Sequence, residues 1–528
     1  MSSPAVEQGA AADRGRSADL KSLARGSSLN FAGAVANGIF QFLLVVVVAQ
    51  ALNRHESGAF FEAVALFTIL SNTCELGADT GLTRMIPRYR VQGRRDDVRH
   101  GLDVAIWPTF AAGAIFAILA FAFSQPLAVF FTHDNSRDTT AVATYIRVLA
   151  AFLPIAGAYT VAIAGTRGFG TMVPNALVDR FAKSAAQTAA VAVIVFAGGG
   201  TRDIAIAWGV PIVLGMIAAA LWLRVLLYEL AAETGPPSRP RTPIRELASE
   251  FWKFTAPRGL TGVFQVTTLW VGTLLVGELK GTADAAVYTA STRYLVAGSV
   301  VNLAIIQAIA PKLSELLSAG LTERAKDVYQ VATSWLMALA WPMYITLGLF
   351  APVLLRAFGH DYSAGAASMQ ILAGAMLVAT GVGPVDIVLL MGGRSFWNLF
   401  NVVVALALNI GLSYALIPRI GIAGAAVAWA ASILFNNIAP LLEVRAILHV
   451  HPFGAAFPAV AGSALLCFGG LGVAAIAVLG QTLPALIGYF IAATAIYVAL
   501  LYRFRARVEL PLLLQTVSRG RIRVSVPG

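Results

Sequence analysis

Charged residues are scarce in this 528-residue chain: Asp, Glu, Lys and Arg together make up only 12% of it. Soluble globular proteins carry about 25%. Since 58% of the residues are hydrophobic and the mean hydropathy is +0.75, most of the surface of the folded chain is expected to face lipid. Cysteine is also scarce. The two cysteines, Cys74 and Cys467, lie inside hydrophobic segments, which excludes a disulfide framework and favours two buried apolar side chains.

Motifs of ATP-driven pumps, metal sites and membrane enzymes are missing as well. No Gly-rich loop ending in Lys-Ser or Lys-Thr follows a strand, which argues against a pump with its own ATPase. The six histidines are scattered, and the closest pair, His449 and His451, has no acidic or cysteine neighbour, so neither a metal nor another cofactor is expected. A membrane glycan polymerase or ligase would need a large extramembrane loop for its active site, and the sequence has none. We therefore predict that the chain is not an enzyme.

Long apolar runs dominate what is present. A helix needs about 20 apolar residues to cross the hydrocarbon core of a bilayer, and fourteen runs reach that length. The first of them is as long as a full span, so no cleaved signal peptide is predicted. The sequence thus predicts an all-α polytopic membrane protein. Its predicted spans are 28–52, 57–79, 102–124, 141–166, 175–198, 203–224, 254–277, 284–310, 330–351, 364–391, 396–417, 421–444, 455–479 and 482–502.

Basic residues decide the predicted orientation, because Lys and Arg collect on the cytoplasmic side of membrane proteins. With the N-terminus inside, 30 of the 38 basic residues lie on the inner side and 8 on the outer side. An even number of spans then places the C-terminus inside as well. The basic residues are therefore explained as topology signals, and no nucleic-acid partner is expected.

The two halves of the chain carry the same landmarks, about 224 residues apart. Four such pairs of similar motifs, in the same order, predict two parallel repeats of six helices related by an axis along the membrane normal. The last two helices lie outside the duplication. A duplicated bundle of this kind is common in transporters that alternate access around a central cavity. The paired landmarks are Gly38-Ile39-Phe40-Gln41 and Gly262-Val263-Phe264-Gln265, Pro87-Arg88 and Pro311-Lys312, Gly165-Thr166-Arg167 and Gly392-Gly393-Arg394, and Ala207-Trp208 and Ala428-Trp429.

The repeat divides the chain into six predicted parts. The longest inner connection contains Gly235-Pro236-Pro237 and Pro240, which break helices and mark a hinge between two lobes. The predicted parts are a disordered cytoplasmic leader (1–27), an N-lobe (28–224), a cytoplasmic inter-lobe linker (225–253), a C-lobe (254–444), an extra helix pair (455–502) and a basic cytoplasmic tail (503–528).

Polar side chains gather on one face of four predicted spans. An ionisable group inside a membrane is costly, so each is a functional candidate by default. These spans are the first two of each repeat, and their helical spacing predicts one central hydrophilic cavity lined by both lobes. The stripes consist of Asn30, Asn37 and Gln41 in 28–52, Thr68, Ser71, Asn72, Glu75 and Asp79 in 57–79, Arg258, Thr261, Gln265 and Thr268 in 254–277, and Arg293 and Gln307 in 284–310.

Each candidate also has a structural interpretation. Stripes of Asn and Gln often hydrogen-bond neighbouring helices, an interpretation that stays open for Asn37, Gln41 and Gln265. Interfacial anchoring is favoured for the charged residues near the inner boundary, which are Asp79, Arg84, Arg88 and Asp386.

Arg293 is the strongest candidate because of its depth. It lies about nine residues into its predicted span, roughly 13 Å along the axis at 1.5 Å per residue. Snorkelling to the interface is difficult from that depth, so contact with a substrate or counter-ion is favoured over a structural ion pair. Glu75 has three interpretations that the sequence does not separate: a partner of Arg84, a proton carrier, or an ion ligand.

The segment from Gly58 to Arg88 carries a family resemblance. It reads Gly58-Ala59-Phe60-Phe61, then Glu75-Leu76-Gly77-Ala78-Asp79-Thr80-Gly81-Leu82-Thr83-Arg84, then Ile86-Pro87-Arg88. A Gly-aromatic helix start and a Leu-Gly-rich end followed by Arg resemble the signature of bacterial polysaccharide flippases (O-antigen, Wzx-like). Those proteins belong to the multidrug, oligosaccharidyl-lipid and polysaccharide exporter superfamily, which the predicted topology also resembles over the whole chain.

The resemblance implies a V-shaped pair of lobes that alternate access without ATP hydrolysis. It also implies a cargo of polyprenyl-pyrophosphate-linked oligosaccharide, which is moved from the inner to the outer leaflet in a step coupled to an ion gradient. A cationic cavity suits a pyrophosphate, because Arg is a natural partner of phosphate. By position, the implied substrate-binding residues are Arg293, Arg258, Arg84, Asn37, Gln41, Gln265 and Asn72, and those for ion coupling are Glu75 and Asp79.

A location and partners follow from the same resemblance. It implies a multi-pass protein of the bacterial cytoplasmic (inner) membrane that serves lipopolysaccharide or exopolysaccharide biosynthesis for the cell envelope. The implied partners are the lipid bilayer, the polyprenyl-linked glycan, and glycan polymerases or glycosyltransferases.

Four alternatives stay open. A proton- or sodium-coupled drug/cation antiporter of the same fold would have an acidic cavity and usually twelve helices. Lipid II flippases of the superfamily also have fourteen helices, but tend to carry more basic residues in the first helix than the single Arg25 at its mouth here. A membrane glycan polymerase or ligase would need the large loop that is missing. A non-transporting scaffold for glycan assembly has no distinguishing sequence feature.

Overall fold

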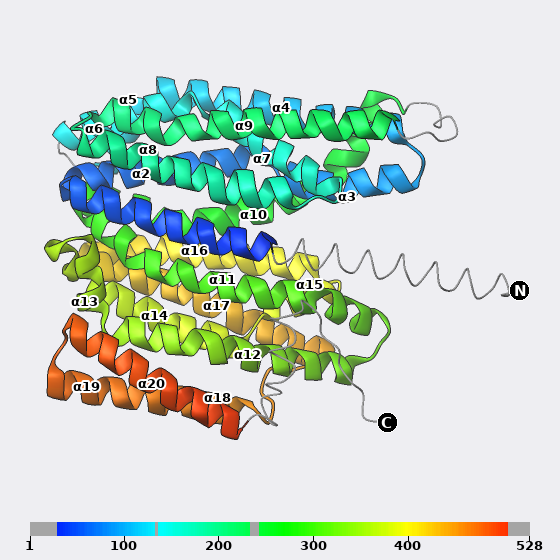
Figure 1. Cartoon of the computed structure of the whole chain (residues 1–528). Coiled ribbons are helices and arrows are strands. Elements are labelled where there is room, and N and C mark those ends of the chain that lie inside the picture. Colours follow the sequence, from blue (N-terminus) through cyan, green and yellow to red (C-terminus); the bar gives the residue numbers. More distant parts are fainter. Residues whose placement is uncertain (1–28, 133–135, 233–241, 505–528) are drawn as a thin grey trace, which may run out of the picture.

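The computed structural model describes residues 29–132, 136–232 and 242–504. The predicted leader 1–27 and nearly all of the predicted tail 503–528 lie outside these residues. The described part is helical, without a single strand, and its long helices run roughly side by side (Figure 1). The all-α prediction is thereby confirmed.

The first half of the described chain forms one set of packed helices. It opens with the helix Leu29–Ala51. The elements that follow are α2 (Arg54–Glu75), α3 (Ala78–Val91), α4 (Arg95–Ala122), α5 (Ser124–Phe131), α6 (Ser136–Ala150), α7 (Leu153–Gly168), the π-helix η1 (Asn175–Lys183), α8 (Ser184–Phe196) and α9 (Thr201–Ala232).

The second half forms another set, which lies beside the first in Figure 1. Its elements are α10 (Ile244–Lys280), α11 (Thr282–Ser318), α12 (Thr322–Leu349), α13 (Ala351–Leu355), η2 (Arg356–Phe358), η3 (His360–Gly365), α14 (Ala366–Val382), α15 (Val385–Met391), α16 (Ser395–Ile420), α17 (Ile422–Leu448), α18 (Phe457–Ala464), the π-helix η4 (Leu465–Gly470), α19 (Leu471–Leu479) and α20 (Leu483–Arg503).

Every predicted span falls on helical segments, but several segments differ from the prediction in length or continuity. The span 57–79 is broken between α2 and α3, where Leu76 and Gly77 both have positive φ. The span 141–166 is bent by 49° between α6 and α7, at the point where Pro154 begins α7. Among the described residues, eleven helices are long and apolar enough to cross a membrane, and the bent pair makes twelve. The number of fourteen therefore stays a prediction.

The predicted linker 225–253 is mostly helix at its two ends. Helix α9 continues to Ala232, and α10 already begins at Ile244. The breakers Gly235-Pro236-Pro237 and Pro240 lie outside the described residues. Helix α10 therefore joins an amphipathic start to an apolar span in one continuous helix.

The last helices pack on one side of the second half. The side chains of Phe350 and Tyr489 are stacked with centroids 5.2 Å apart, and the Tyr497 hydroxyl donates to the carbonyl oxygen of Ala338. Cys467 is buried in the same cluster, and Cys74 is buried in the first half. Neither cysteine forms a disulfide, as predicted.

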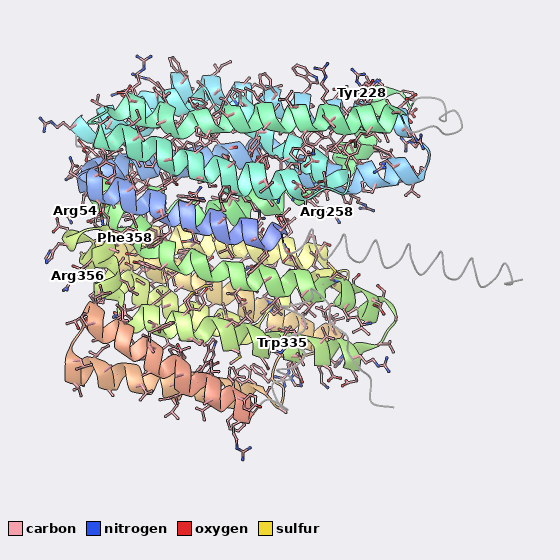
Figure 2. The ribbon with its side chains drawn as sticks, viewed as in Figure 1. Arg54, Tyr228, Arg258, Trp335, Arg356 and Phe358 are labelled. Carbon is pink, nitrogen blue, oxygen red and sulfur yellow. The ribbon has the colours of Figure 1, made fainter. Side chains whose placement is uncertain are left out.

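The two halves are joined by polar contacts at one end of the bundle, here named the Arg54 end. Figure 2 shows Arg54, Arg356 and Phe358 at this end. Arg54 pairs with Asp361 across the two halves at 3.7 Å. The Asp138 carboxylate accepts a hydrogen bond from Thr282 at 2.6 Å and contacts the imidazole of His55 at 2.8 Å. These contacts close the two halves against each other at the Arg54 end.

At the opposite end, named the Arg94 end, the start of α10 is held against the first half. Glu250 of α10 contacts Arg88 at 3.1 Å and Arg94 at 3.4 Å. Arg94 also donates to Asp97 at 2.7 Å, and the Thr242 hydroxyl donates to the same carboxylate at 2.7 Å. Since Asp97 is almost fully buried, this network anchors the beginning of α10 to the turn between α3 and α4.

We expect Asp97→Ala to lower the melting temperature of the purified protein. The substitution leaves Arg94 and Thr242 without their shared buried acceptor, a loss of about 1–3 kcal/mol. The exposed Asp103 on the same helix provides the control, and Asp103→Ala should change the melting temperature little. Equal melting temperatures for the two variants would contradict an anchoring role for Asp97.

Candidate functional site

Two cavities lie inside the described helices. The first, of about 380 Å³, is enclosed mainly by helices of the first half. The second, of about 370 Å³, is enclosed by helices of the second half alone. Leu269 lines both cavities, so it lies in the wall between them. Residues of both halves line the first cavity, as predicted for a central cavity. The second cavity, within the second half, was not predicted. Helix α10 contacts helices of both halves.

The first cavity combines polar stripes from several helices with aromatic side chains. Helices α10 and α11 of the second half contribute Leu269, Trp270 and Arg293. The lining residues from the first half are Asn37, Gly38, Gln41, Phe42, Val64, Phe67, Thr68, Ser71, Asn72, Glu75, Ala156, Tyr159, Thr160, Lys183, Gln187, Trp208 and Ile212.

Arg293 supplies the first positive charge of this cavity. Its guanidinium carbon lies 4.3 Å from the centre of the Trp270 ring, a cation–π contact that holds the side chain in place. Its Nε is buried and has no hydrogen-bond partner among the described residues. An unsatisfied buried donor of this kind is costly, and a bound acceptor would relieve the cost.

Lys183 supplies the second positive charge, at the end of the π-helix η1. Its Nζ lies 2.5 Å from Asp179 and 5.1 Å from the centre of the Tyr159 ring. π-Helical turns are rare and frequently mark functional sites. Glu75 lies in the same cavity, within reach of the hydroxyl of Thr160. The cavity therefore holds two cations and one carboxyl group, and a further carboxylate pairs with Lys183.

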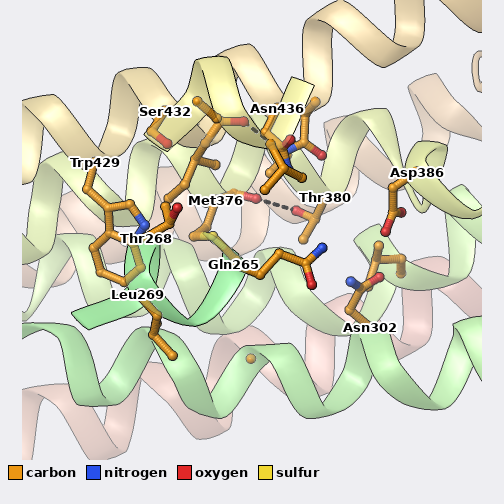
Figure 3. A pocket seen from close by; sticks show the side chains of 18 of the residues that line it. Gln265, Thr268, Leu269, Asn302, Met376, Thr380, Asp386, Trp429, Ser432 and Asn436 are labelled. Carbon is orange, nitrogen blue, oxygen red and sulfur yellow. Dashed lines mark hydrogen bonds between the residues drawn. The ribbon is translucent and has the colours of Figure 1, made fainter. Parts of the chain in front are cut away.

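The second cavity has a different chemistry. Its polar lining consists of amides, hydroxyls and the single carboxyl group of Asp386, and no Lys or Arg of the described residues lines it. Figure 3 shows Asp386 and Asn302 facing each other across the cavity, with Gln265 beside them. The indole of Trp429 lines the end of the cavity away from Asn302.

The structure brings six of the nine predicted site residues into the cavities. Gln265 lines the second cavity. The five predicted residues that line the first cavity are Asn37, Gln41, Asn72, Glu75 and Arg293.

The other three lie outside both cavities. Arg84 and Arg258 are exposed and stack on the same ring of Phe254, each at 4.0 Å. Asp79 lies 3.6 Å from Arg167 in an ion pair. No residue of α3, which carries Arg84, lines either cavity, and Arg258 lies on α10 nearer the Arg94 end than the lining residue Gln265.

Two polar residues of the predicted span 28–52 form hydrogen bonds to neighbouring helices. The Asn30 amide oxygen accepts a bond of 2.8 Å from Asn175, and Asn37 accepts one of 2.6 Å from the Ser184 hydroxyl. Asn37 thus bridges two helices and also lines the first cavity, and its role in substrate binding stays a prediction.

Sequence reasoning missed Lys183, Asn302, Asn436 and Asn437. Lys183 was counted among the inner-side basic residues, although it falls inside the predicted span 175–198. An ionisable residue inside a span was the signal that could have identified it. The three asparagines line the second cavity. Asn302 lies in the striped span 284–310, but nine residues from Arg293 and so on the opposite face of the helix. Asn436 and Asn437 lie in the span 421–444, which has few other polar residues and no predicted stripe.

Two of the repeated landmarks occupy corresponding places in the two cavities. Gln41 and Trp208 line the first cavity, and Gln265 and Trp429 line the second. Residues separated by the repeat offset therefore line the cavity of their own half at corresponding places.

Comparison with known proteins agrees with this architecture. The family model of polysaccharide biosynthesis proteins matches residues 23–317, more than half of the chain. No curated protein matches. Among solved structures, the lipid II flippase MurJ in an inward closed conformation is similar with a TM-score of 0.71 at 12% identity, over 89% of this chain and 97% of that chain.

Two drug transporters have the same fold. An inward-facing multidrug resistance transporter of the MATE family and MOP superfamily matches with a TM-score of 0.61 at 15% identity, over 78% of this chain and 94% of that one. A variant of the Vibrio cholerae MATE transporter VcmN matches with a TM-score of 0.58 at 14% identity, over 82% and 98%. None of these three descriptions names an enzyme. At such identities the likeness establishes the fold alone.

The fold is that of the MOP superfamily, and its many apolar helices define a multi-pass membrane protein. By its sequence, the chain belongs to the polysaccharide biosynthesis protein family. Family and fold agree with the resemblance inferred from the segment Gly58 to Arg88.

Proposed function

We propose that the protein is a flippase that moves a polyprenyl-pyrophosphate-linked oligosaccharide from the inner to the outer leaflet of the bacterial cytoplasmic membrane. The observation that carries the proposal is the buried, unpartnered Nε of Arg293 in a cavity that also contains Lys183. A pyrophosphate offers charged acceptor oxygens to both groups, and arginine binds such oxygens in a defined geometry. The polyprenyl tail stays in the lipid while the head group crosses.

Alternating access is the motion that we propose. The repeated landmarks that line the two cavities support a division into an N-lobe (28–224) and a C-lobe (254–444), each with six helices, followed by the pair 455–502 and with both termini inside. In this scheme the Arg54 end faces outward, and the contacts of Asp138 with Thr282 and of Arg54 with Asp361 close it. Breaking them would open the cavity of the N-lobe to the outer leaflet.

Ion coupling is proposed for Glu75 rather than Asp79. Glu75 lines the first cavity together with Lys183, so a proton or cation taken up by its carboxyl group would change the charge that the substrate meets. Asp79 lies outside the cavity and pairs with Arg167. Glycan polymerases and glycosyltransferases are proposed as partners because they consume and supply the flipped lipid.

A cation antiporter is the main alternative, and the charges of the first cavity argue against it. Cationic drugs need an excess of carboxylates. The first cavity has no such excess, since Arg293, Lys183 and Glu75 line it and Asp179 pairs with Lys183. A lipid II flippase would share the cationic cavity, and it differs from our proposal in the glycan that it accepts.

Ligand-dependent melting separates the two classes. We expect a polyprenyl-pyrophosphate that carries a short oligosaccharide to raise the melting temperature of the purified protein, and the cationic dye ethidium to leave it unchanged. At 100 times the dissociation constant, the gain in unfolding free energy is about 2.7 kcal/mol. Lys183→Gln should reduce the shift, whereas Lys312→Gln, at an exposed lysine outside both cavities, should not. Stabilisation by ethidium alone would favour the antiporter.

A further inference from the structure

The second cavity is lined by amide side chains, one of which has a buried oxygen atom without a partner among the described residues. The amides of Gln265, Asn302 and Asn436 line it, and the Oδ1 of Asn302 is buried without a hydrogen-bond partner among the described residues. An amide both donates and accepts hydrogen bonds. A buried polar atom left without a partner lowers stability, so a ligand hydroxyl that donates to the Asn302 Oδ1 would satisfy a group that the fold leaves unsatisfied.

Charge excludes the pyrophosphate from this cavity. Of the described residues that line it, the only one with a formal charge is Asp386, and a carboxylate repels phosphate oxygens. A carboxylate is, however, a good acceptor for hydroxyl groups. The cavity is therefore suited to a neutral polyhydroxylated ligand rather than to an anion.

The wall of the second cavity also includes an aromatic surface on which a sugar ring can stack. The indole of Trp429 lines the cavity at the end away from Asn302 (Figure 3), and a flat aromatic ring packs well against the C–H face of a sugar ring. The volume of about 370 Å³ lies within the range of roughly 300–1,000 Å³ that is typical of small-molecule pockets. Amides, one carboxyl group and one aromatic ring are together the chemistry that recognises a saccharide.

We infer that the second cavity is a saccharide-binding site for the glycan end of the lipid-linked substrate, an inference that rests on the proposed function. The pyrophosphate binds Arg293 and Lys183 in the first cavity, and sugar rings reach the second cavity past Leu269, which lines both. The two halves thus bind two chemically different parts of one molecule. Selectivity for the glycan then resides in Asn302, Asn436 and Trp429, and not in the cationic cavity.

The test compares binding of three lipids to the full-length protein in nanodiscs. The probes are a bare polyprenyl-pyrophosphate, the same lipid with one galactose, and the same lipid with one N-acetylglucosamine. We expect at least one glycosylated lipid to bind wild type more tightly than the bare lipid. The double variant Asn302→Ala/Asn436→Ala should lower the affinity for that glycosylated lipid by about tenfold, as the loss of two hydrogen bonds implies. Its affinity for the bare lipid should change by less than about twofold.

Two control variants make the result specific. Arg293→Ala should lower the affinity for bare and glycosylated lipids by the same factor, because Arg293 binds the pyrophosphate that all of them share. Asn398→Ala, at an asparagine near the start of α16 that lines neither cavity, should change neither affinity.

Each outcome decides a different question. The saccharide site would be overturned, and the flippase proposal left intact, if wild type bound all three lipids with equal affinity. The same conclusion would follow if the double variant lost affinity for bare and glycosylated lipids by the same factor. If wild type bound none of the three lipids, both the saccharide site and the flippase proposal would be overturned. A lower affinity of Trp429→Phe for glycosylated lipids alone would add support, since the substitution shrinks the stacking surface and removes the indole N–H.

Discussion

Arg293→Ala is expected to reduce protein-dependent translocation of lipid-linked oligosaccharide by at least about tenfold. A charge-assisted hydrogen bond to a buried group contributes about 1.5–3 kcal/mol, and every 1.4 kcal/mol corresponds to a factor of ten. The side chain contacts the Trp270 ring at 4.3 Å, and its buried Nε has no partner among the described residues, so it is available to a bound phosphate oxygen. The rate of translocation in proteoliposomes is the measurement.

Two further arginine variants define the role of Arg293. Arg293→Lys keeps the charge but not the planar guanidinium, and should retain only part of the activity. Arg147→Ala removes an exposed arginine that bonds Ser124 at 2.7 Å and lines neither cavity, so it should translocate at the wild-type rate. If Arg147→Ala and Arg293→Ala had equal rates, the anion site would not be at Arg293.

Gly259→Ala is expected to destabilise the protein by about 1–3 kcal/mol, the usual effect of overpacking. A Cβ at Gly259 would overlap the backbone of Leu76 and Gly77, at the break between α2 and α3. Gly77 has a φ of 75°, a conformation that favours glycine, so the backbone at this break has little freedom to move aside. The apparent melting temperature and the yield of monodisperse protein are the measurements.

The matched control lies one turn further along the same helix. A Cβ at Gly262 would meet nothing nearer than the Asn72 side chain at 3.8 Å. Alanine also has the higher helix propensity, by about 1 kcal/mol, so Gly262→Ala should be neutral or slightly stabilising. A lower melting temperature for Gly262→Ala than for Gly259→Ala would contradict the close contact between α10 and the break.

Much of the fold could be predicted because lipid imposes a simple pattern on sequence. A span must be apolar over a fixed length, and this requirement alone located helical segments across the described chain. The break at Leu76 and Gly77 could not be predicted, because it depends on the contact with Gly259, a residue of a distant helix. The bend before α7 has a local cause in Pro154, yet hydropathy continues through it.

The candidate site could be predicted where residues carry a local signal. Arg293 is conspicuous because its charge lies deep in an apolar run, and Gln41 and Gln265 because they repeat. Arg84 and Arg258 are assigned to the site through the family resemblance, but they stack on Phe254 outside the cavities. Helical spacing gives the direction of a side chain and not what it meets. The second cavity is lined by residues from helices that are distant in the sequence, which no local pattern records.

The measurement that tests the central claim most directly is leaflet translocation by the purified wild-type protein in proteoliposomes. A fluorescent polyprenyl-pyrophosphate oligosaccharide would be placed in one leaflet, and its arrival in the other would be followed by quenching, with and without a proton gradient. We predict movement that depends on the protein. Absence of movement, together with proton-coupled transport of a cationic dye, would contradict the account and identify the protein as an antiporter.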